Sequence, residues 1–335
     1  MIATLAIALC QPQLANYRLI GRFWPEDGSY TCEWPGSAVQ FATESSKVTV
    51  HLKASTPNDR WQVEVDGKPT EVLKLDPKLE DYTINLPSSS KHLVTLVRRT
   101  ECFSGETTWK GVDNNNVPAP HGPSRKIEII GDSISAGYGV DGKSHDEHYS
   151  FDTANAYLAY GWVAARVVKA DCTIVAWSGR KMWPDNTIPS IYDYVLPNAK
   201  KGMTDHPDDT STQAVLINLA TNDFGPGIPD KTKWCGAYVD FTRKVRSRFP
   251  KAHIYLATGS MMTDTWPPNA KHLTTLKEYL DSIKATLNDS KVHRIDFDPQ
   301  NEQVDGIGAD WHPNQNTQRK MGERFAAALK KDLGW

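Results

Sequence analysis

The sequence predicts an N-terminal domain built of β-strands, followed by an α/β domain with a mostly parallel sheet. The chain has 335 residues, a length that suits about two domains of ordinary size. Alternating apolar and polar residues recur through about the first third of the chain, which is typical of antiparallel strands. Beyond it, short apolar segments alternate with amphipathic ones, which is typical of β–α–β units.

The N-terminal domain is expected to be a β-sandwich over residues 18–112. Residues 47–53 (KVTVHLK) alternate apolar and polar side chains with the period of two that a strand requires. Asp66 and Gly67 lie between two further runs of this kind and predict a tight hairpin turn. The expected strands are 47–53, 61–65, 70–74, 82–86 and 92–98. No helical pattern interrupts them.

Residues 113–124 (DNNNVPAPHGPS) show no periodicity and predict a linker. The α/β domain is then expected over residues 125–335. Its expected strands are 127–130, 172–176, 214–219, 253–257 and 292–297, and its expected helices are 157–169, 234–248, 271–288 and 317–329. In a parallel sheet of this kind ligands bind beyond the carboxyl ends of the strands, so the residues that follow each strand are the candidates for a site.

The composition excludes several classes of function. Lys and Arg number 38 and Asp and Glu 40, so the net charge is -2 and nothing indicates binding to nucleic acid or an anionic membrane. No apolar run of about 20 residues is present, so we expect no membrane-spanning helix. The 11 Trp nearly equal the 12 Tyr. Because Trp stacks well on half-polar surfaces, this surplus indicates either a sugar ligand or large side chains that fill cores.

The N-terminus and the cysteines bear on the compartment. Residues 1–17 are a possible signal segment, since they are largely apolar, although no basic residue precedes Arg18. We expect a secreted or extracytoplasmic protein; the alternative is an N-terminal strand of the mature fold. Cys32 and Cys102 could pair, but four cysteines allow three connectivities and the sequence does not choose among them. The cysteines are Cys10, Cys32, Cys102, Cys172 and Cys235.

The first strand of the α/β domain is followed by Gly131, Asp132 and Ser133. A Ser at this edge of the sheet can act as a nucleophile, with backbone N–H groups nearby for an oxyanion, or it can simply cap a helix. Residues 137–142 match G-x-G-x-x-G, but they begin too far beyond the strand for a dinucleotide site. No G-K-[ST] follows, so a P-loop is also excluded.

Three further strand ends or loops carry candidate groups. Gly179 follows the second strand, where a glycine lets backbone N–H groups approach a ligand. Asn222 follows the third strand and can direct an amide N–H at a developing negative charge. His312 precedes the last helix, two residues after Asp310, as expected for a general base and the group that orients it. Each of these residues also has an ordinary interpretation as a turn or cap.

Taken together, these residues resemble the four sequence blocks of the SGNH (GDSL-type) hydrolases. The matching residues are Gly131-Asp132-Ser133-Ile134, Gly179, Asn222 and His312, in family order. A β domain before the linker, with the segment Arg98-Arg99-Thr100-Glu101, narrows the resemblance to carbohydrate esterase family two. The resemblance covers nearly the whole chain after residue 17. It implies a flavodoxin-like SGNH hydrolase domain preceded by a jelly-roll-like β-sandwich.

Two positions depart from the family pattern. The third block usually opens with Gly, and this chain has Ala220 there. The broader D-x-x-H pattern would place Asp at position 309, where this chain has Ala309, and Asp310 stands two residues before His312 instead. His312 is therefore oriented either by the Asp310 carboxylate, which makes a triad, or by a backbone carbonyl, which leaves a Ser–His dyad.

The resemblance also implies an activity: removal of acetyl groups from plant polysaccharides such as xylan or glucomannan. It implies Ser133 as nucleophile, His312 as base and Asp310 as the group that orients it, with no metal or organic cofactor. The expected oxyanion hole consists of the Ser133 and Gly179 backbone N–H groups and the Asn222 side chain.

Substrate contacts and partners are less directly indicated. Trp183, Trp266 and Trp311 follow strand ends or adjoin His312, so each could stack on a sugar ring or serve in packing. We expect a monomer whose partner is an acetylated polysaccharide or oligosaccharide. The alternatives are an SGNH lipase or thioesterase acting on another ester, or a carbohydrate-binding protein with a vestigial hydrolase. The mean hydropathy of -0.51 favours a polar substrate.

Overall fold

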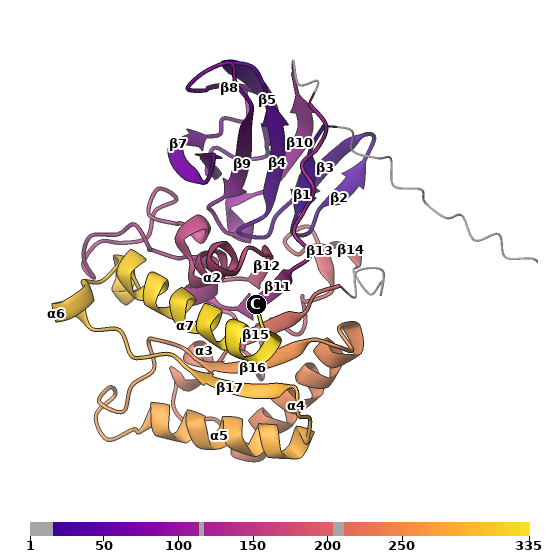
Figure 1. Cartoon of the computed structure of the whole chain (residues 1–335). Helices are drawn as coiled ribbons and strands as arrows, with labels where there is room; N and C mark the ends of the chain where they lie inside the picture. Colours follow the sequence, from indigo (N-terminus) through magenta and orange to yellow (C-terminus); the bar gives the residue numbers. More distant parts are fainter. Residues whose placement is uncertain (1–15, 114–116, 204–210) are drawn as a thin grey trace, which may run out of the picture.

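The computed structural model describes residues 16–113, 117–203 and 211–335 of the chain (Figure 1). Cys10 and nearly all of the possible signal segment lie outside the described residues. The N-terminal part contains two antiparallel sheets, and the C-terminal part contains a parallel sheet with helices on both faces. In the described ranges, no helix combines the length and the apolarity that crossing a bilayer requires.

The N-terminal part consists of two five-stranded antiparallel sheets, with strand orders β1-β4-β9-β6-β7 and β2-β3-β10-β5-β8. All five expected strands are confirmed. Five further strands were not expected, and most of these are short or almost uniformly buried and so show no clear period of two. The bounds are β1 Arg18–Ile20, β2 Trp24–Glu26, β3 Ser29–Cys32, β4 Ala38–Thr43, β5 Lys47–Ala54, β6 Arg60–Val65, β7 Lys68–Lys74, β8 Asp81–Asn85, β9 His92–Arg98 and β10 Thr107–Val112.

Local sequence explains how these strands form. Every second side chain of β5 is buried, which is the pattern that the alternation predicts. Asp66 and Gly67 both have positive φ, 52° and 77°, as a two-residue hairpin loop between β6 and β7 requires. Trp61 from one sheet and Trp109 from the other are fully buried in a single apolar core. The two sheets therefore pack face to face.

The C-terminal sheet is parallel throughout, in the order β12-β11-β15-β16-β17. Neighbouring side chains of a strand face opposite layers: Ile129 packs with α2 and α7, and Ile130 packs with α4 and α5. Figure 1 shows α7 and α5 on opposite faces of this sheet. The strands are β11 Lys126–Gly131, β12 Asp171–Ala176, β15 Ala214–Asn218, β16 His253–Thr258 and β17 Val292–Asp296. The helices are α2 Tyr160–Val168, α4 Lys231–Arg248, α5 His272–Leu287 and α7 Gln315–Leu333.

Several short elements were not expected from the sequence. The expected helix over 157–169 is broken at Ala159, whose ψ of 150° is extended, so that only α2 is a regular helix. The short elements are η1 Cys102–Ser104, α1 Ser133–Ala136, η2 Ala156–Leu158, β13 Tyr194–Leu196, β14 Lys201–Met203, α3 Thr221–Phe224, α6 Glu302–Asp305 and η4 Ala309–Trp311. Most of them lie in the loops that follow the strands.

The strand order locates a site. Numbered within the parallel sheet alone, the order is 2-1-3-4-5, which is the doubly wound flavodoxin-like order. The direction of winding reverses between β11 and β15, and the chain leaves these neighbouring strands toward opposite faces of the sheet. A crevice at the carboxyl ends of these strands is where such sheets bind ligands.

Direct contacts join the N-terminal sheets to the parallel sheet. The Trp162 indole of α2 donates a hydrogen bond of 3.0 Å to the Gly36 carbonyl. Gly36 has φ +71°, and a Cβ there would lie 2.7 Å from the Trp162 Nε1, so only glycine fits this approach. Arg18 forms an ion pair of 2.8 Å with Asp171 at the start of β12.

The cysteines correct one expectation. In the described residues Cys32, Cys102, Cys172 and Cys235 are all free, so the suggested pair between Cys32 and Cys102 does not form. Cys32 ends β3 and packs in the core between the two N-terminal sheets. Cys102 instead packs into the core of the parallel sheet, with its Sγ 3.9 Å from the Ala176 carbonyl oxygen.

Candidate active site

Ser133 lies where β11 ends and α1 begins. The Asp132 side chain caps this short helix and accepts from the Ile134 N–H at 3.1 Å. The cap of the helix is thus Asp132 rather than Ser133, and the interpretation of Ser133 as an N-cap is wrong. Ser133 is 5% exposed, and its hydroxyl is available to a partner outside the helix. That partner is His312.

The Ser133 Oγ lies 2.9 Å from the His312 Nε2. The other ring nitrogen, Nδ1, lies 2.9 Å from the backbone carbonyl oxygen of Asp310. Because a carbonyl can only accept, Nδ1 carries the proton and Nε2 accepts from the Ser133 hydroxyl. Burial lowers the pKa of His312, which favours the neutral imidazole that this arrangement needs.

The Asp310 carboxylate does not contact His312. It accepts hydrogen bonds from the Tyr138 hydroxyl (2.8 Å), the Tyr149 N–H (2.8 Å) and the His148 Nδ1 (2.9 Å). Asp310 and the next residue, Trp311, both have positive φ, 48° and 64°. This backbone conformation directs the Asp310 carbonyl, and not its side chain, to the imidazole. Of the two alternatives left open by the sequence, the structure has the backbone carbonyl.

The loop after β12 carries Gly179. Its φ is +77°, and a Cβ at this position would meet nothing within 4 Å, so the residue borders open space. In the described part of the chain its N–H donates to no protein acceptor. The preceding residue, Ser178, is held from the N-terminal part by Glu101, whose carboxylate accepts from the Ser178 N–H and hydroxyl.

Asn222 lies in α3, at the end of β15. Its Nδ2 donates to the Arg180 carbonyl at 2.9 Å and lies 3.4 Å from the Asp132 carboxylate. The first bond links the loop after β15 to the loop after β12, and the second is longer than a usual N–H···O bond and is therefore the weaker of the two. Ala220, which replaces the usual Gly, has φ 171°, an extended conformation that any residue adopts.

Two buried carboxyl groups support these loops. Burial raises the pKa of Asp132 to about 7. Burial also raises the pKa of Asp223, whose carboxylate accepts from the Met182 and Trp183 N–H groups and from the Trp234 indole. Asp223 therefore orders the loop that follows Gly179, and it does not face Ser133 in any contact that the described residues make.

The three candidate tryptophans differ in setting. Trp311 is 54% exposed, and its ring stacks on His145 at 3.9 Å between centroids and 11° between planes. Trp266 is 74% exposed on the loop after β16. Trp183 is partly buried against the core and lines a cavity of about 270 Å³. Much of the Trp surplus serves packing instead, since Trp34, Trp61, Trp109 and Trp234 are fully buried.

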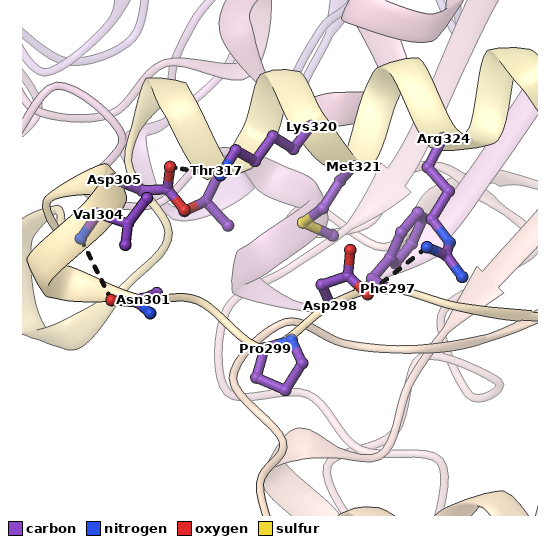
Figure 2. A pocket seen from close by; sticks show the side chains of 10 residues that line it. All are labelled: Phe297, Asp298, Pro299, Asn301, Val304, Asp305, Thr317, Lys320, Met321 and Arg324. Atoms are coloured by element: carbon purple, nitrogen blue, oxygen red, sulfur yellow. Dashed lines mark hydrogen bonds and ion pairs between the residues drawn. The ribbon is translucent and has the colours of Figure 1, made fainter.

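A second cavity, of about 230 Å³, lies between α7 and the segment that follows β17 (Figure 2). Its cations are already paired: the Lys320 Nζ lies 2.6 Å from Asp305, and the Arg324 guanidinium 3.5 Å from Asp298. Neither Ser133 nor any other residue of the four blocks lines it. The described residues also contain no group of three or more His, Cys, Asp or Glu placed to hold a metal ion.

Sequence reasoning missed Tyr138. Its ring packs against the His312 imidazole at 4.1 Å between centroids, while its hydroxyl donates to Asp310. Tyr138 lies five residues beyond Ser133, in the turn that follows α1, and nothing in the local pattern distinguishes it from a core aromatic. Its contact depends on the loop that carries His312, which is remote in sequence.

Two protein-family models match the chain. The model described as carbohydrate esterase 2 N-terminal matches residues 19–120. The model described as GDSL-like Lipase/Acylhydrolase family matches residues 129–320. The first match covers the two N-terminal sheets, and the second covers most of the parallel-sheet part with all four sequence blocks.

Relatives and solved structures agree with these matches. The cellulase/esterase CelE of Acetivibrio thermocellus is 33% identical over 331 residues, which are 94% of this chain but only 39% of CelE. An acetylxylan esterase / glucomannan deacetylase of Cellvibrio japonicus is 26% identical over 100% of this chain and 93% of its own length. The structure of a family two carbohydrate esterase from Clostridium thermocellum, in complex with cellohexaose, has a TM-score of 0.86 at 32% identity and covers 95% of this chain and 99% of that one.

Proposed function

The chain belongs to the family two carbohydrate esterases, which are carboxylic ester hydrolases, and we propose that it removes O-acetyl groups from plant polysaccharides such as xylan and glucomannan through a serine acyl-enzyme. The single observation that carries the mechanism is the 2.9 Å contact between the Ser133 Oγ and the His312 Nε2, at the carboxyl end of the parallel sheet. This is the contact that an activated serine nucleophile needs.

In the first step the Ser133 Oγ attacks the acetyl carbonyl carbon while the His312 Nε2 takes the hydroxyl proton. The Asp310 carbonyl holds the Nδ1 proton and so keeps the imidazole in the tautomer whose Nε2 can act as a base. The tetrahedral intermediate then collapses. The bond from carbon to the sugar oxygen breaks, and the imidazolium returns its proton to that oxygen.

The negative oxygen of the intermediate would be stabilised by the Ser133 and Gly179 backbone N–H groups and by the Asn222 amide. These groups follow β11, β12 and β15, which are adjacent strands. Supporting this assignment, the Gly179 N–H has no internal acceptor in the described residues and borders open space. One such donor is typically worth about 3–4 kcal/mol of barrier.

Water completes the cycle. His312 removes a proton from the water as its oxygen attacks the acetyl-Ser133 carbonyl. The second tetrahedral intermediate collapses, the imidazolium returns its proton to the Ser133 Oγ, and acetic acid leaves. The acid keeps the second proton of the water and releases it to solvent when it ionises to acetate.

A carbohydrate substrate is supported by two features. The names of the Cellvibrio relative and of the Clostridium structure refer to acetylated polysaccharides or a bound cello-oligosaccharide. The exposed ring of Trp311, held by its stack on His145, adjoins His312 and offers a flat surface for a pyranose. We further propose that the protein acts outside the cytoplasm, where such polymers occur.

The test is the Ser133→Ala variant, assayed by acetate release from acetylated xylan and with 4-nitrophenyl acetate. We expect turnover to fall by about 10³-fold or more, because the nucleophile is lost. Ser135→Ala is the matched control: Ser135 lies in the same short helix, and its hydroxyl bonds to Tyr160 instead of His312. Near-wild-type turnover of Ser133→Ala would overturn the mechanism. Faster turnover of long-chain acyl esters than of acetyl esters would favour a lipase.

A further inference from the structure

We propose that Glu101, a residue of the N-terminal part, is a positioning residue for the oxyanion site: its carboxylate holds Ser178 so that the neighbouring Gly179 N–H stays directed at the reacting carbonyl. This inference rests on the proposed function, since it assigns a role within the same site. It makes the N-terminal sheets a part of the catalytic apparatus, in addition to any contact they make with a polymer.

The contact is direct and uses both carboxylate oxygens. The Ser178 N–H donates to the Glu101 Oε2 at 2.8 Å, and the Ser178 hydroxyl donates to the Oε1 at 2.5 Å. Glu101 is fully buried, so water does not compete for these bonds. The Gly179 N–H belongs to the peptide group that joins Ser178 to Gly179. Holding Ser178 in this way therefore restricts the directions in which that N–H can point.

The other end of Glu101 is also fixed. It follows β9 by three residues and precedes η1, and its backbone carbonyl accepts from the Ser104 hydroxyl at 2.6 Å. Cys102, the next residue, packs into the core of the parallel sheet beside the end of β12. The carboxylate is therefore presented from a rigid part of the fold, which is what precise positioning of a donor requires.

Gly179 needs such a restraint. Glycine has the widest choice of backbone conformations, and the φ of +77° at Gly179 is one of many that the residue could adopt. The other hydrogen bonds of this loop do not involve the Ser178 side chain or the Gly179 N–H. The Trp177 N–H donates to the Gly131 carbonyl and the Arg180 N–H to the Trp177 carbonyl, each at 3.3 Å. After Gly179, Asn186 donates to the Gly179 carbonyl at 3.2 Å, and Asn222 donates to the Arg180 carbonyl at 2.9 Å. Glu101 supplies the restraint immediately before it.

The carboxylate is costly to keep in this place for stability alone. In the described residues no Lys, Arg or His forms an ion pair with it, because the nearby Arg98 pairs with Asp59 instead. Burial raises the pKa of Glu101 to about 7, which reflects the free energy needed to bury its charge. A neutral side chain would avoid this cost, so the two bonds to Ser178 are the function that the structure offers for this residue.

The experiment compares kcat and KM for 4-nitrophenyl acetate and acetylated xylan in Glu101→Ala, Glu101→Gln and Ser178→Ala. An interaction that matters in the transition state lowers kcat and leaves KM nearly unchanged. For Glu101→Ala we expect kcat to fall about 10- to 100-fold, less than for complete loss of a donor. Ser178→Ala, which keeps the N–H bond, and Glu101→Gln, which keeps an acceptor, should each retain more activity than Glu101→Ala.

Glu33→Ala is the matched control. Glu33 is also a buried acid from the N-terminal part, and its carboxylate holds the Asn198 and Ala199 N–H groups of the C-terminal part at 2.5 and 3.1 Å. The Glu33→Ala substitution therefore removes the same kind of contact between the two parts, but at a place other than the loop that carries Gly179. Thermal melting of every variant shows which of them are folded.

The outcomes separate this inference from the proposed function. If wild-type protein hydrolyses acetyl esters and folded Glu101→Ala loses no more kcat than Glu33→Ala, the inference is overturned while the esterase assignment stands. If Glu101→Ala does not fold, Ser178→Ala and Glu101→Gln decide: unchanged kcat in both overturns the inference, and a lower kcat with unchanged KM supports it. If the wild-type protein hydrolyses no acetyl ester, the proposed function itself fails.

Discussion

At the scale of single residues, Asp310 contributes to the candidate site both through its backbone carbonyl and through its carboxylate. The sequence does not show which of the two groups faces His312. Its backbone carbonyl accepts from the His312 Nδ1, and its carboxylate holds the Tyr138 hydroxyl. Tyr138 in turn packs on the His312 ring at 4.1 Å. The imidazole is therefore oriented by the backbone of Asp310 and confined by an aromatic ring that the side chain of Asp310 positions.

A first prediction follows from this division. His312→Ala should lower kcat/KM for 4-nitrophenyl acetate by about 10³-fold or more, because it removes the proposed base. Asp310→Asn keeps the backbone carbonyl and should cost about 10-fold or less. Steady-state kinetics of the two variants measure the difference. Equal losses would show that the Asp310 carboxylate, and not its carbonyl, sustains the base.

A second prediction concerns pH. His312 must be neutral to accept the Ser133 proton, and burial lowers its pKa below the ordinary value of about 6.5. Activity should therefore fall on the acid side, with an apparent pKa below 6.5 in the kcat/KM profile. The charge of Asp310 raises the pKa of His312, so Asp310→Asn should shift the acid limb to still lower pH. An apparent pKa of 7 or above for wild type would contradict this.

At the scale of elements, helix α7 starts three residues after His312, and its start is stabilised by Asn314. The Asn314 side chain accepts from the Asn316 and Thr317 N–H groups and donates to the Asp305 carbonyl at 2.7 Å. The first two bonds satisfy helix N–H groups that have no partner within the helix. The third fixes the loop that carries His312 to α6.

We predict that Asn314→Ala lowers the free energy of unfolding by about 1–2 kcal/mol, the usual cost of losing an N-cap, as measured by urea unfolding. Asp230→Ala is the control, because Asp230 caps α4 in the same way through the Lys233 N–H. Both variants should lose similar stability, but only Asn314→Ala should also lower kcat. A loss of kcat in Asp230→Ala as well would show that general destabilisation, and not the His312 loop, is responsible.

At the scale of the whole molecule, the buried Glu101 carboxyl group lies at the contact between the N-terminal and C-terminal parts of the fold. Glu101 has a pKa of about 7 in the folded protein, against an ordinary value of about 4.5 in the unfolded chain. Between these values the folded state binds the extra proton. The stability linked to this proton is complete below pH 4.5 and is lost as the pH rises through about 7.

The fourth prediction is that Glu101→Gln gains stability relative to wild type as the pH rises from 5 to 8. The reason is that the variant has no charge to bury. Urea midpoints measured at each pH give the difference between the two proteins, which isolates this carboxyl from other titrating groups. The Glu44→Gln variant, made at an exposed position, is the control for the substitution itself. A Glu101→Gln difference that does not change with pH would contradict the prediction.

Much of the fold followed from local pattern. All ten strands and the four long helices that we expected are present, because alternation at period two and amphipathic runs report which side chains face a core. The shortest strands, such as β1 and β2, carry too few residues for a period to show. The break at Ala159 and the short helix α1 were also missed, because they depend on single turns.

The sequence by itself determined the strand-end positions of Ser133, Gly179 and Asn222, since a block motif placed after an apolar strand must lie at the carboxyl edge of a parallel sheet. It left open what orients His312 and how the cysteines pair, and the four described cysteines are free. These matters depend on contacts between residues far apart in the chain and on the φ of individual residues.

The tertiary structure alone decided that the Asp310 carbonyl faces His312, that Tyr138 packs on it, and that Glu101 reaches Ser178. The physical reason is the distance along the chain between the residues that interact. Hydrophobic periodicity involves neighbouring residues and can be seen in the sequence. The hydrogen bond between Glu101 and Ser178 forms only when packing brings the N-terminal and C-terminal parts to within 3 Å of each other.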